Sequence, residues 1–287
     1  MKWGIVMKKT VKKIVLQTDF GLEDGAVSAM YGVAFSVDSS LGIYNLTHEI
    51  PQYNIWEASY RLYQTVNYWP QETVFVSVVD PGVGTERLSV VAKTADNHYI
   101  VTPDNGTLTH IHESIGVVEV RQIDESVNRL PNSGESYTFH GRDVYVYTAA
   151  RLAAGVISFE EVGPICDLNK IVSLPHHQAE VVENKIVGNV AILDGRFGNL
   201  WTNISRELLF DYGVKYGDNI EVTISNSYTI FYQNKIQIGQ SFAKSHVGDP
   251  ILFINSLDKL GVAINQGSFA GAHHIQSGDN WKIQIKK

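Results

Sequence analysis

The chain has 287 residues, of which 44% are apolar, and this length allows one large domain or two smaller ones with substantial cores. Its 23 basic and 30 acidic residues give a net charge of -7, which provides no field to attract nucleic acid or an anionic membrane. Because no apolar run reaches the roughly 18 residues that span a bilayer, and the one cysteine, Cys166, cannot form an internal disulfide, a cytoplasmic protein is expected.

The first half of the chain alternates strand-like and helical segments. Five lysines among the first thirteen residues predict a solvated N-terminal arm. Residues 13–18 then predict a buried strand, and residues 25–37 predict a helix with apolar residues on one side, namely Val27, Met30, Ala34 and Val37. The pattern repeats with a strand within 41–50, a helix within 54–69 and a strand at 73–79.

Three further strands are expected at 88–94, 98–102 and 117–123, and residues 141–155 predict a helix that ends at Gly155. Alternation of this kind is typical of a mainly parallel sheet with helices on its faces.

After about Pro175 the pattern changes to short strands separated by turn signals. Residues 178–194 predict a hairpin that turns at Glu183 and Asn184, and strand-like segments follow at 218–224, 228–233, 250–256, 261–266 and 281–287. We therefore expect two domains. Residues 1–175 form an α/β domain with a mainly parallel sheet, and residues 176–287 form a smaller all-β domain, either a barrel or a sandwich.

Polar residues stand where several apolar runs of the first half end. Asp19 follows the first strand, Asp80 follows the third, residues 103–106 (PDNG) follow a later strand, and His140 precedes a helix. In an open α/β sheet the carboxyl ends of the strands form the ligand crevice, so we expect these residues to converge on a site. Taken alone, each is more typical of an ordinary turn.

Seven segments together resemble one family, the S-adenosyl-L-methionine (SAM) hydrolases, also called SAM hydroxide adenosyltransferases, which are related to fluorinating and chlorinating adenosyl transferases. They span nearly the whole chain, and several are long and rich in Gly, Asp and Asn at fixed spacing. The segments are TDFG (18–21), VVDPGVGTER (78–87), TPDNG (102–106), FHGRD (139–143), LDGRFGNLWTNI (193–204), SFA (241–243) and AINQGSFAG (263–271).

The resemblance implies an N-terminal α/β domain, a C-terminal β domain and a homotrimer whose active sites lie between the N-terminal domain of one subunit and the C-terminal domain of the next. It also implies hydrolysis of SAM to adenosine and L-methionine, by in-line attack of water or hydroxide on the 5′ carbon of the ribose, without a cofactor or metal. Because the sulfonium leaves as a neutral thioether, the reaction needs a positioned oxygen nucleophile and no general acid.

By the same resemblance, Asp19 grips the ribose diol, since one carboxylate can accept from both hydroxyls. Asp80, Arg87 and His140 form a triad at the nucleophile. His140 is the natural titratable base, with Asp80 and Arg87 orienting the water, but direct capture of hydroxide is the other possibility. Tyr53 stands where the halogenating relatives have a tryptophan that forms a wall of the pocket.

The remaining substrate contacts implied by the resemblance lie in the C-terminal domain. Asp194 meets the methionine ammonium and Ser256 its carboxylate. Adenine is contacted by Asn199, by Phe242 and by the backbone near Asn265 and Gln266, which suits purine chemistry because an amide can pair with the base edge and a phenyl ring can stack on it. Ile264 stands where the halogenating relatives have an arginine.

Two alternatives to hydrolysis stay open. A halide-dependent SAM adenosyl transferase is one, although halogenating relatives carry a tyrosine in place of Asp80 and lack His140, and fluorinating ones have a serine at Gly141. A carboxylate at Asp80 would repel a halide and favours water as the nucleophile. The other alternative is a non-catalytic SAM or adenosine binding protein, against which the complete triad argues.

Overall fold

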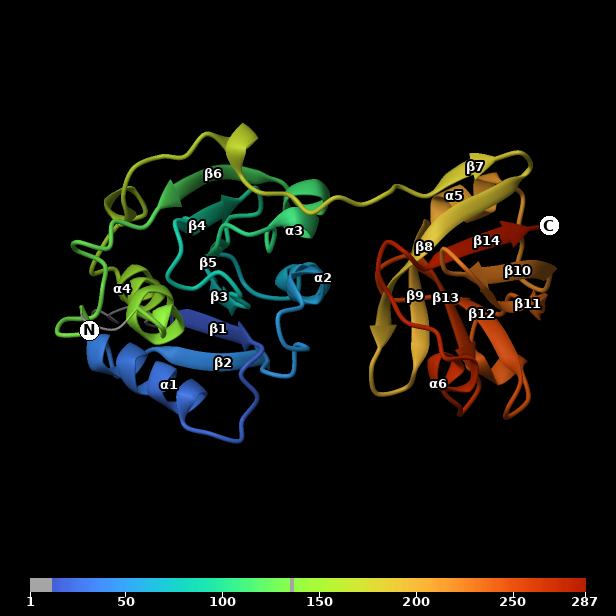
Figure 1. The fold of residues 1–287 in the computed structure, drawn as a ribbon, viewed down its shortest axis with the longest axis horizontal. Coiled ribbons are helices and arrows are strands. Elements are labelled where there is room, and N and C mark those ends of the chain that lie inside the picture. The colour runs from blue at the N-terminus through green and yellow to red at the C-terminus, as the bar shows by residue number, and fades with distance from the viewer. Residues whose placement is uncertain (1–11, 135–136) are drawn as a thin grey trace, which may run out of the picture. The chain divides into compact units, whose positions relative to one another are not determined.

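The computed structural model describes residues 12–134 and 137–287. The chain divides into two compact units, Met1–Leu174 and Pro175–Lys287 (Figure 1). The expected N-terminal arm falls within residues 1–11, outside the described residues. Among the helices of the described part of the chain, none has the length and apolar character needed to cross a membrane.

The first unit is built on a six-stranded sheet in the order β2-β1-β3-β5-β4-β6. Its strands are β1 (Lys13–Thr18), β2 (Gly42–Thr47), β3 (Val74–Val78), β4 (Ser89–Thr94), β5 (Tyr99–Pro103) and β6 (Val117–Gln122). The neighbours β2, β1, β3 and β5 pair in parallel, while β4 is antiparallel to β5 and to β6. The expected mainly parallel sheet is therefore confirmed.

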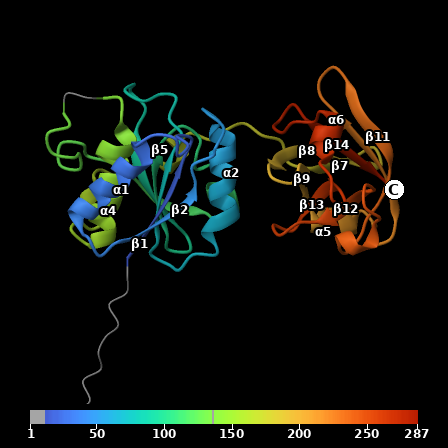
Figure 2. The ribbon, with the colours of Figure 1, turned by 90° about the horizontal axis from the view of Figure 1, so that it is seen from below.

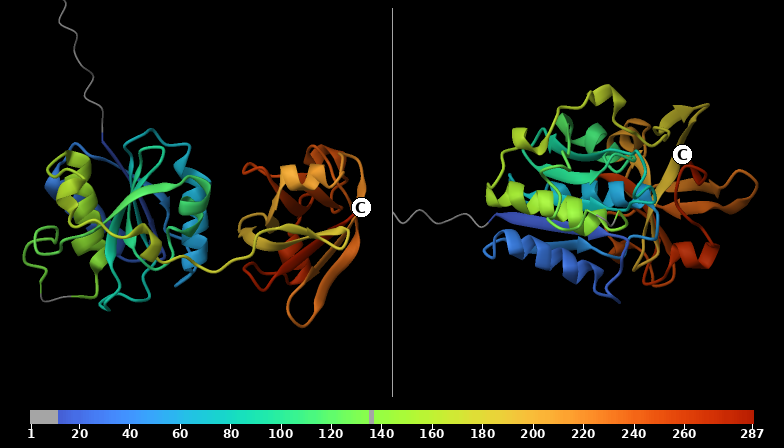
Figure 3. Two further views of the ribbon diagram at one scale, coloured as in Figure 1. Left: turned by 90° about the horizontal axis from the view of Figure 1, so that it is seen from above. Right: turned by 60° about the vertical axis from the view of Figure 1, so that its left-hand side comes forward.

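Helices cover both faces of this sheet (Figures 2 and 3). On one face lie α1 (Ala26–Val37) and α4 (Tyr147–Ala154), and α2 (Ile55–Val66) lies on the other with the short α3 (Thr109–Ser114). In α2, apolar residues at helical spacing face the sheet, and the Asn54 side chain caps the helix by accepting from the Glu57 backbone N–H. The sequence did not predict α3, because six residues are too few to show helical periodicity.

The helix expected over 141–155 is divided in two. Its first part, Gly141–Val146, is a π-helix, and α4 follows directly. At the C-terminal end, Gly155 adopts the left-handed conformation with φ of 70°, which confirms the predicted stop. Two 3₁₀ turns, Glu160–Val162 and Leu168–Lys170, complete the unit. A π-turn of this kind inside a helix often marks a functional site.

The second unit is an eight-stranded antiparallel sheet that curls toward a barrel. Its strands follow the path β11-β10-β14-β8-β9-β13-β12, with β7 paired to β8. Ile238, just beyond β11, bridges to Leu252 in β12, so the two ends of the path approach each other. The strands are β7 (Glu180–Val182), β8 (Lys185–Asp194), β9 (Asn199–Ser205), β10 (Asn219–Ser225), β11 (Ile230–Gln237), β12 (Pro250–Ile254), β13 (Lys259–Ile264) and β14 (Lys282–Lys286).

The predicted hairpin is confirmed at its turn, because Glu183 and Asn184 have φ of 47° and 65°, as a two-residue turn between antiparallel strands requires. The sequence missed β9 and three short helical segments of this unit. These are α5 (Arg206–Asp211), the 3₁₀ turn Phe242–Lys244 and α6 (Phe269–His273).

Candidate active site

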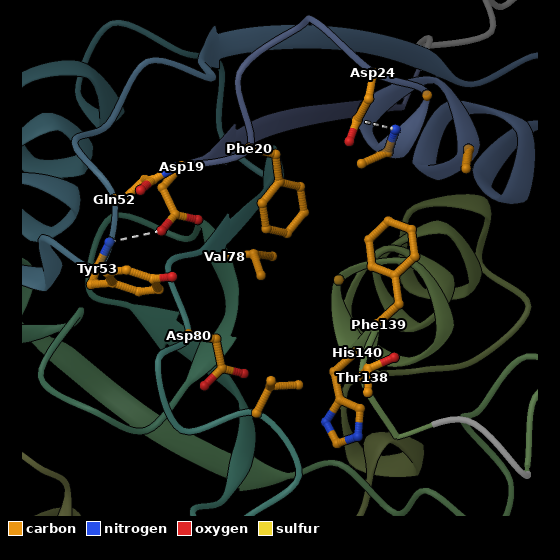
Figure 4. A pocket seen from close by; sticks show the side chains of 15 residues that line it. Asp19, Phe20, Asp24, Gln52, Tyr53, Val78, Asp80, Thr138, Phe139 and His140 are labelled. Carbon is orange, nitrogen blue, oxygen red and sulfur yellow. Dashed lines mark hydrogen bonds between the residues drawn. The ribbon is translucent and has the colours of Figure 1, made fainter.

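A pocket of about 700 Å³ opens at the carboxyl edge of the parallel strands in the first unit (Figure 4). We call it the first pocket. It brings together Asp19, Tyr53, Asp80 and His140, all of which the sequence placed at a site. Its lining is Asp19, Phe20, Asp24, Gly25, Ala26, Ala29, Gln52, Tyr53, Val78, Asp80, Val83, Thr138, Phe139, His140 and Gly141.

Arg87 links Asp80 to His140 and completes the triad. Its Nε donates to Asp80 Oδ1 at 2.9 Å, and its Nη2 donates to Asp80 Oδ2, which makes the ion pair bidentate. The same Nη2 lies 3.1 Å from His140 Nδ1. The Asp80 and Arg87 side chains are only 5% and 11% exposed, so each charge depends on the other for compensation.

The direction of the Arg87–His140 hydrogen bond fixes the form of the imidazole ring. A guanidinium can only donate, so Nδ1 must accept, and the neutral ring then carries its proton on Nε2. Burial lowers the pKa of His140 below its ordinary 6.5. The negative charge of Glu125 raises this pKa, and the positive charge of Arg87 lowers it. Nε2 is itself buried and has no hydrogen-bond partner within residues 12–134 and 137–287. The one lone pair that the neutral ring can offer is on Nδ1, and it is already engaged by Arg87.

Tyr145 contacts both Arg87 and Asp80 of the triad, and the sequence analysis did not identify this residue. Its buried ring lies beneath the Arg87 guanidinium, at 5.6 Å from Cζ to the ring centroid, and its hydroxyl donates to Asp80 Oδ2 at 3.4 Å. Burial and the Asp80 charge raise the pKa of Tyr145 well above its ordinary value, which keeps the hydroxyl a donor. In an α-helix, side chains five residues apart point in directions that differ by about 140° around the helix axis. The wider π-turn brings such a pair together here, and the ring centroids of Tyr145 and His140 are 6.4 Å apart.

Asp19 reaches the pocket from the turn after β1. Its Oδ2 accepts from the Tyr53 backbone N–H at 2.9 Å, as the dashed line in Figure 4 shows. Tyr53 has φ of 65°, an uncommon conformation for a residue with a Cβ, and the residue is 69% exposed. This strained backbone points an N–H at the carboxylate and fixes its orientation.

Two phenyl rings form an apolar wall of the first pocket. Phe20 and Phe139 pack edge to face with centroids 5.8 Å apart. A Cβ on Gly141 would lie 3.3 Å from Phe20 and 3.4 Å from Phe139, so a larger residue there would crowd the pair. The absence of a side chain at Gly141 therefore sets the spacing of this wall.

The expectation for residues 103–106 is wrong, because none of them lines the first pocket. The Asp104 carboxylate accepts from the Val172 backbone N–H at 2.9 Å. The Asn105 amide donates to the Val79 carbonyl at 2.9 Å and so secures the backbone directly before Asp80. These residues form a turn that supports the site without entering it.

A second pocket, of about 750 Å³, lies in the second unit. It brings together all six residues that the resemblance assigned to this domain. Lining residues that the sequence analysis did not single out include Arg196, Phe197 and Trp201. The full lining is Asp194, Arg196, Phe197, Asn199, Trp201, Phe242, Phe253, Ile254, Asn255, Ser256, Ile264, Asn265, Gln266, Gly267 and Ser268.

Asp194 and Asn199 face each other across the β8–β9 hairpin, and the Asn199 amide donates to Asp194 Oδ2 at 3.3 Å. Phe242 packs on Phe253 with centroids 5.0 Å apart. The Asn265 amide donates to the carbonyls of Phe242 and Ser245, at 3.1 and 2.9 Å, so this side chain holds the segment that carries Phe242. The Asn265 backbone is engaged as well, because its N–H donates to the Asp249 carbonyl and its carbonyl accepts from the Gly248 N–H, both at 2.9 Å.

The hairpin turn of the second pocket requires glycine at Gly198. This residue has φ of 68°, and a Cβ there would lie 1.9 Å from Ser268 Oγ and 3.0 Å from the Ser268 Cα. Its backbone N–H and carbonyl also bond to Asp194 and Ala270. The turn therefore packs directly on the N-terminus of α6.

Within the described ranges, no group of three or more His, Cys, Asp or Glu side chains is placed to hold a metal ion. Fold and site together define a class of protein. It is an enzyme with an α/β unit that carries a buried acid–arginine–histidine triad and a barrel-like unit that carries a polar, aromatic pocket for a small molecule.

Comparison with known proteins gives the family. Residues 14–163 match the model for the SAM hydroxide adenosyltransferase N-terminal domain, and residues 188–282 match the model for the C-terminal domain. The chain therefore belongs to the SAM hydroxide adenosyltransferase family. It is 33% identical to an (R)-S-adenosyl-L-methionine hydrolase of Methanocaldococcus jannaschii, covering 90% of this chain and 89% of that relative.

A fluorinase of Actinopolyspora mzabensis is also similar, with 27% identity over 94% of this chain and 96% of the fluorinase. Among solved structures, a conserved protein of Thermotoga maritima superposes with a TM-score of 0.86 at 33% identity, covering 96% of this chain and all of that one. Both units of the chain are thus shared with these relatives.

Gly198→Ala should disrupt the second pocket, because the new methyl group collides with Ser268 and the left-handed backbone is strained. Because the family resemblance assigns the adenine contacts to this pocket, we expect at least a tenfold loss of adenosine affinity, measured by calorimetry. Gly195→Ala in the same turn is the matched control, since its Cβ would have nothing within 4 Å, and affinity should change less than about twofold. Equal affinities in the two variants would contradict the packing argument.

Proposed function

We propose that the protein hydrolyses S-adenosyl-L-methionine to adenosine and L-methionine. One observation carries the proposal. Asp19, Asp80 and His140 line one pocket, and Arg87 is bonded to the last two, which supplies a nucleophile position beside a carboxylate that can grip a ribose diol. The family membership and the curated hydrolase relatives support the same reaction.

In the proposed reaction one oxygen–carbon bond forms at the ribose 5′ carbon as the carbon–sulfur bond breaks. The sulfur takes both electrons of the broken bond and leaves as the neutral thioether of methionine, and one proton passes to solvent. Because the leaving group needs no proton and no Lewis acid, we propose that neither a cofactor nor a metal takes part.

We propose that hydroxide is captured directly, without His140 acting as a base. The His140 lone pair already accepts from Arg87, and its Nε2 carries a proton, so the ring has no free acceptor for a water proton. In this arrangement the Arg87 guanidinium offsets the Asp80 charge through the bidentate ion pair, so that the carboxylate repels an incoming hydroxide less than an unpaired carboxylate would.

In the second pocket, we propose that Asp194 binds the methionine ammonium and Ser256 its carboxylate. Asn199, Phe242 and the backbone at Asn265 and Gln266 would then bind adenine. Four curated relatives are named for the (R) epimer of the substrate, and we propose that this chain prefers the same epimer at sulfur.

We propose a homotrimer in which the first pocket of one copy and the second pocket of a neighbouring copy bind one substrate molecule. The division of the assigned contacts supports this, since the ribose and nucleophile groups lie in one unit and the adenine and methionine groups in the other. A cytoplasmic location is proposed from the single unpaired cysteine, Cys166.

Purified protein should convert SAM, in halide-free buffer, to equal amounts of adenosine and methionine, followed by chromatography. In water enriched in ¹⁸O, the adenosine 5′-hydroxyl should carry the label, because the oxygen nucleophile comes from solvent. The (R) epimer should react faster than the (S) epimer.

Asp80→Ala and His140→Ala should each lower turnover by well over about tenfold, with modest loss of binding.

Each competing function has its own outcome in that assay. A 5′-halogenated product that forms only with added chloride or fluoride would replace the hydrolase with a halide-dependent transferase. Tight binding of adenosine without product under either condition would favour a binding protein.

Single-turnover rates should rise about tenfold per pH unit between pH 7 and 9 if hydroxide is captured. A base at His140 would instead approach a plateau across this range, because the lowered pKa keeps the ring predominantly neutral from pH 7 to 9. His140→Gln, whose amide oxygen can accept from Arg87, should retain more activity than His140→Ala. A plateau in the wild type would overturn the hydroxide assignment.

The shared site can be tested by mixing subunits. Asp80→Asn damages the first pocket and Asp194→Asn damages the second, so each homotrimer should be inactive. Co-assembled mixtures should recover activity, because an intact first pocket of one variant then meets an intact second pocket of the other. A mixture that stays inactive after subunit exchange, or a monomer in sedimentation, would contradict the arrangement.

A further inference from the structure

Two buried polar side chains lie behind the first pocket and are not part of its lining. Thr18, the last residue of β1, is fully buried, and His48, just after β2, is 3% exposed. Thr18 Oγ1 and His48 Nδ1 lie 2.8 Å apart. Because a buried polar group needs a partner, this pair satisfies both side chains at the end of the sheet that carries Asp19.

The pair belongs to a longer chain of hydrogen bonds. His48 Nε2 lies 2.8 Å from Asn45 Oδ1, which also accepts from the Tyr31 hydroxyl of α1. An amide oxygen can only accept, so His48 Nε2 carries the proton and Nδ1 accepts from the Thr18 hydroxyl. Burial lowers the pKa of His48, which favours this neutral form. Every bond in the chain then has one donor and one acceptor.

His48 also holds the turn that follows Thr18. The Gly21 backbone N–H donates to the His48 carbonyl at 2.8 Å, and the Phe20 N–H donates to Thr18 Oγ1 at 3.2 Å. Residues on both sides of Asp19 are therefore tied to His48, directly or through one hydroxyl. The side chain of Asp19 itself is held from the opposite side by the Tyr53 N–H.

An irregularity in the sheet brings these groups together. The parallel register of β1 and β2 pairs Leu16 with Asn45 but Gln17 with Thr47, which skips Leu46. Because β2 has one extra residue at this point, its register against β1 shifts by one residue, and His48 comes beside Thr18. Such bulges often re-aim side chains next to active sites.

We propose that His48 is a positioning residue that, through Thr18, sets the Asp19 carboxylate for recognition of the ribose diol. The inference rests on the proposed function for the role of Asp19. It assigns a task to His48, Thr18 and Asn45, none of which lines the first pocket. Without the Thr18 hydroxyl, the Asp19 turn loses the bond from the Phe20 N–H and the link to the His48 side chain, and only the backbone bond from Gly21 to His48 remains of these three.

The test compares two ligands that differ only in the diol, adenosine and 2′,3′-dideoxyadenosine, by calorimetry. The wild type should bind adenosine at least about tenfold more tightly, because only adenosine offers hydroxyls to Asp19. Thr18→Val removes the hydroxyl at nearly constant shape. It should lower adenosine affinity by about tenfold and leave dideoxyadenosine within about twofold.

Three further variants serve as controls and rescue. Thr18→Ser keeps a hydroxyl and should retain most of the discrimination between the two nucleosides. Thr102→Val removes a hydroxyl that is equally buried, at the end of β5, but has no hydrogen-bond partner in the described part of the chain, and it should leave both affinities unchanged. His48→Leu should match Thr18→Val, and the double variant should lose little more, since both changes break one network.

A second measurement reads the turn without any ligand. Hydrogen exchange of the Phe20 and Gly21 amides should be about tenfold faster in Thr18→Val than in the wild type, and unchanged in Thr102→Val. Unchanged exchange in Thr18→Val would overturn the network. Faster exchange with equal affinity losses for both nucleosides would overturn the positioning role. A wild type that does not distinguish the nucleosides would instead overturn the ribose assignment of Asp19 in the proposed function.

Discussion

A buried charge has to be compensated, and at the edge of the parallel sheet Asp80 and Arg87 compensate each other. Both side chains are nearly inaccessible, and loss of either partner would leave an isolated charge at a cost of about 3–5 kcal/mol. The neighbouring groups are arranged around this pair. His140 accepts from the guanidinium, Tyr145 lies beneath it, and Asn105 secures the backbone that leads to Asp80. The ion pair thus organises one end of the site, while the turn at Asp19 has separate anchors.

Much of this arrangement could be predicted from the sequence, because it follows from short-range patterns and one topological rule. Period-2 and helical apolar spacing located the six strands of the first unit and two of its main helices. Since parallel strands end at a common edge, Asp19 and Asp80 had to approach each other, and His140 joined them at the start of a helix. The roles of Arg87 and of the second pocket came only from family resemblance, since no local pattern marks them.

The features that the sequence did not reveal depend on contacts between distant segments. Periodicity cannot distinguish a π-turn from an α-turn, so Tyr145 was assigned to an ordinary helix and its contact with the triad was missed. The strand β9 begins with Asn199 and contains Asn203, a residue type depleted from strands, and it is held by its neighbours in the sheet. Thr18 and His48 are 30 residues apart, and it is the bulge in β2 that brings them together.

The wall formed by Phe20 and Phe139 has a consequence for the rate of the proposed reaction. Hydroxide is an anion and the sulfonium is a cation, so the two charges cancel as the new bond forms, and the transition state is less polar than the separated reactants. Water stabilises the separated ions more than it stabilises such a transition state, and it therefore slows the reaction. An apolar wall solvates the ions poorly and penalises the transition state less. The two rings, spaced by the missing side chain of Gly141, thus favour charge neutralisation without touching the nucleophile.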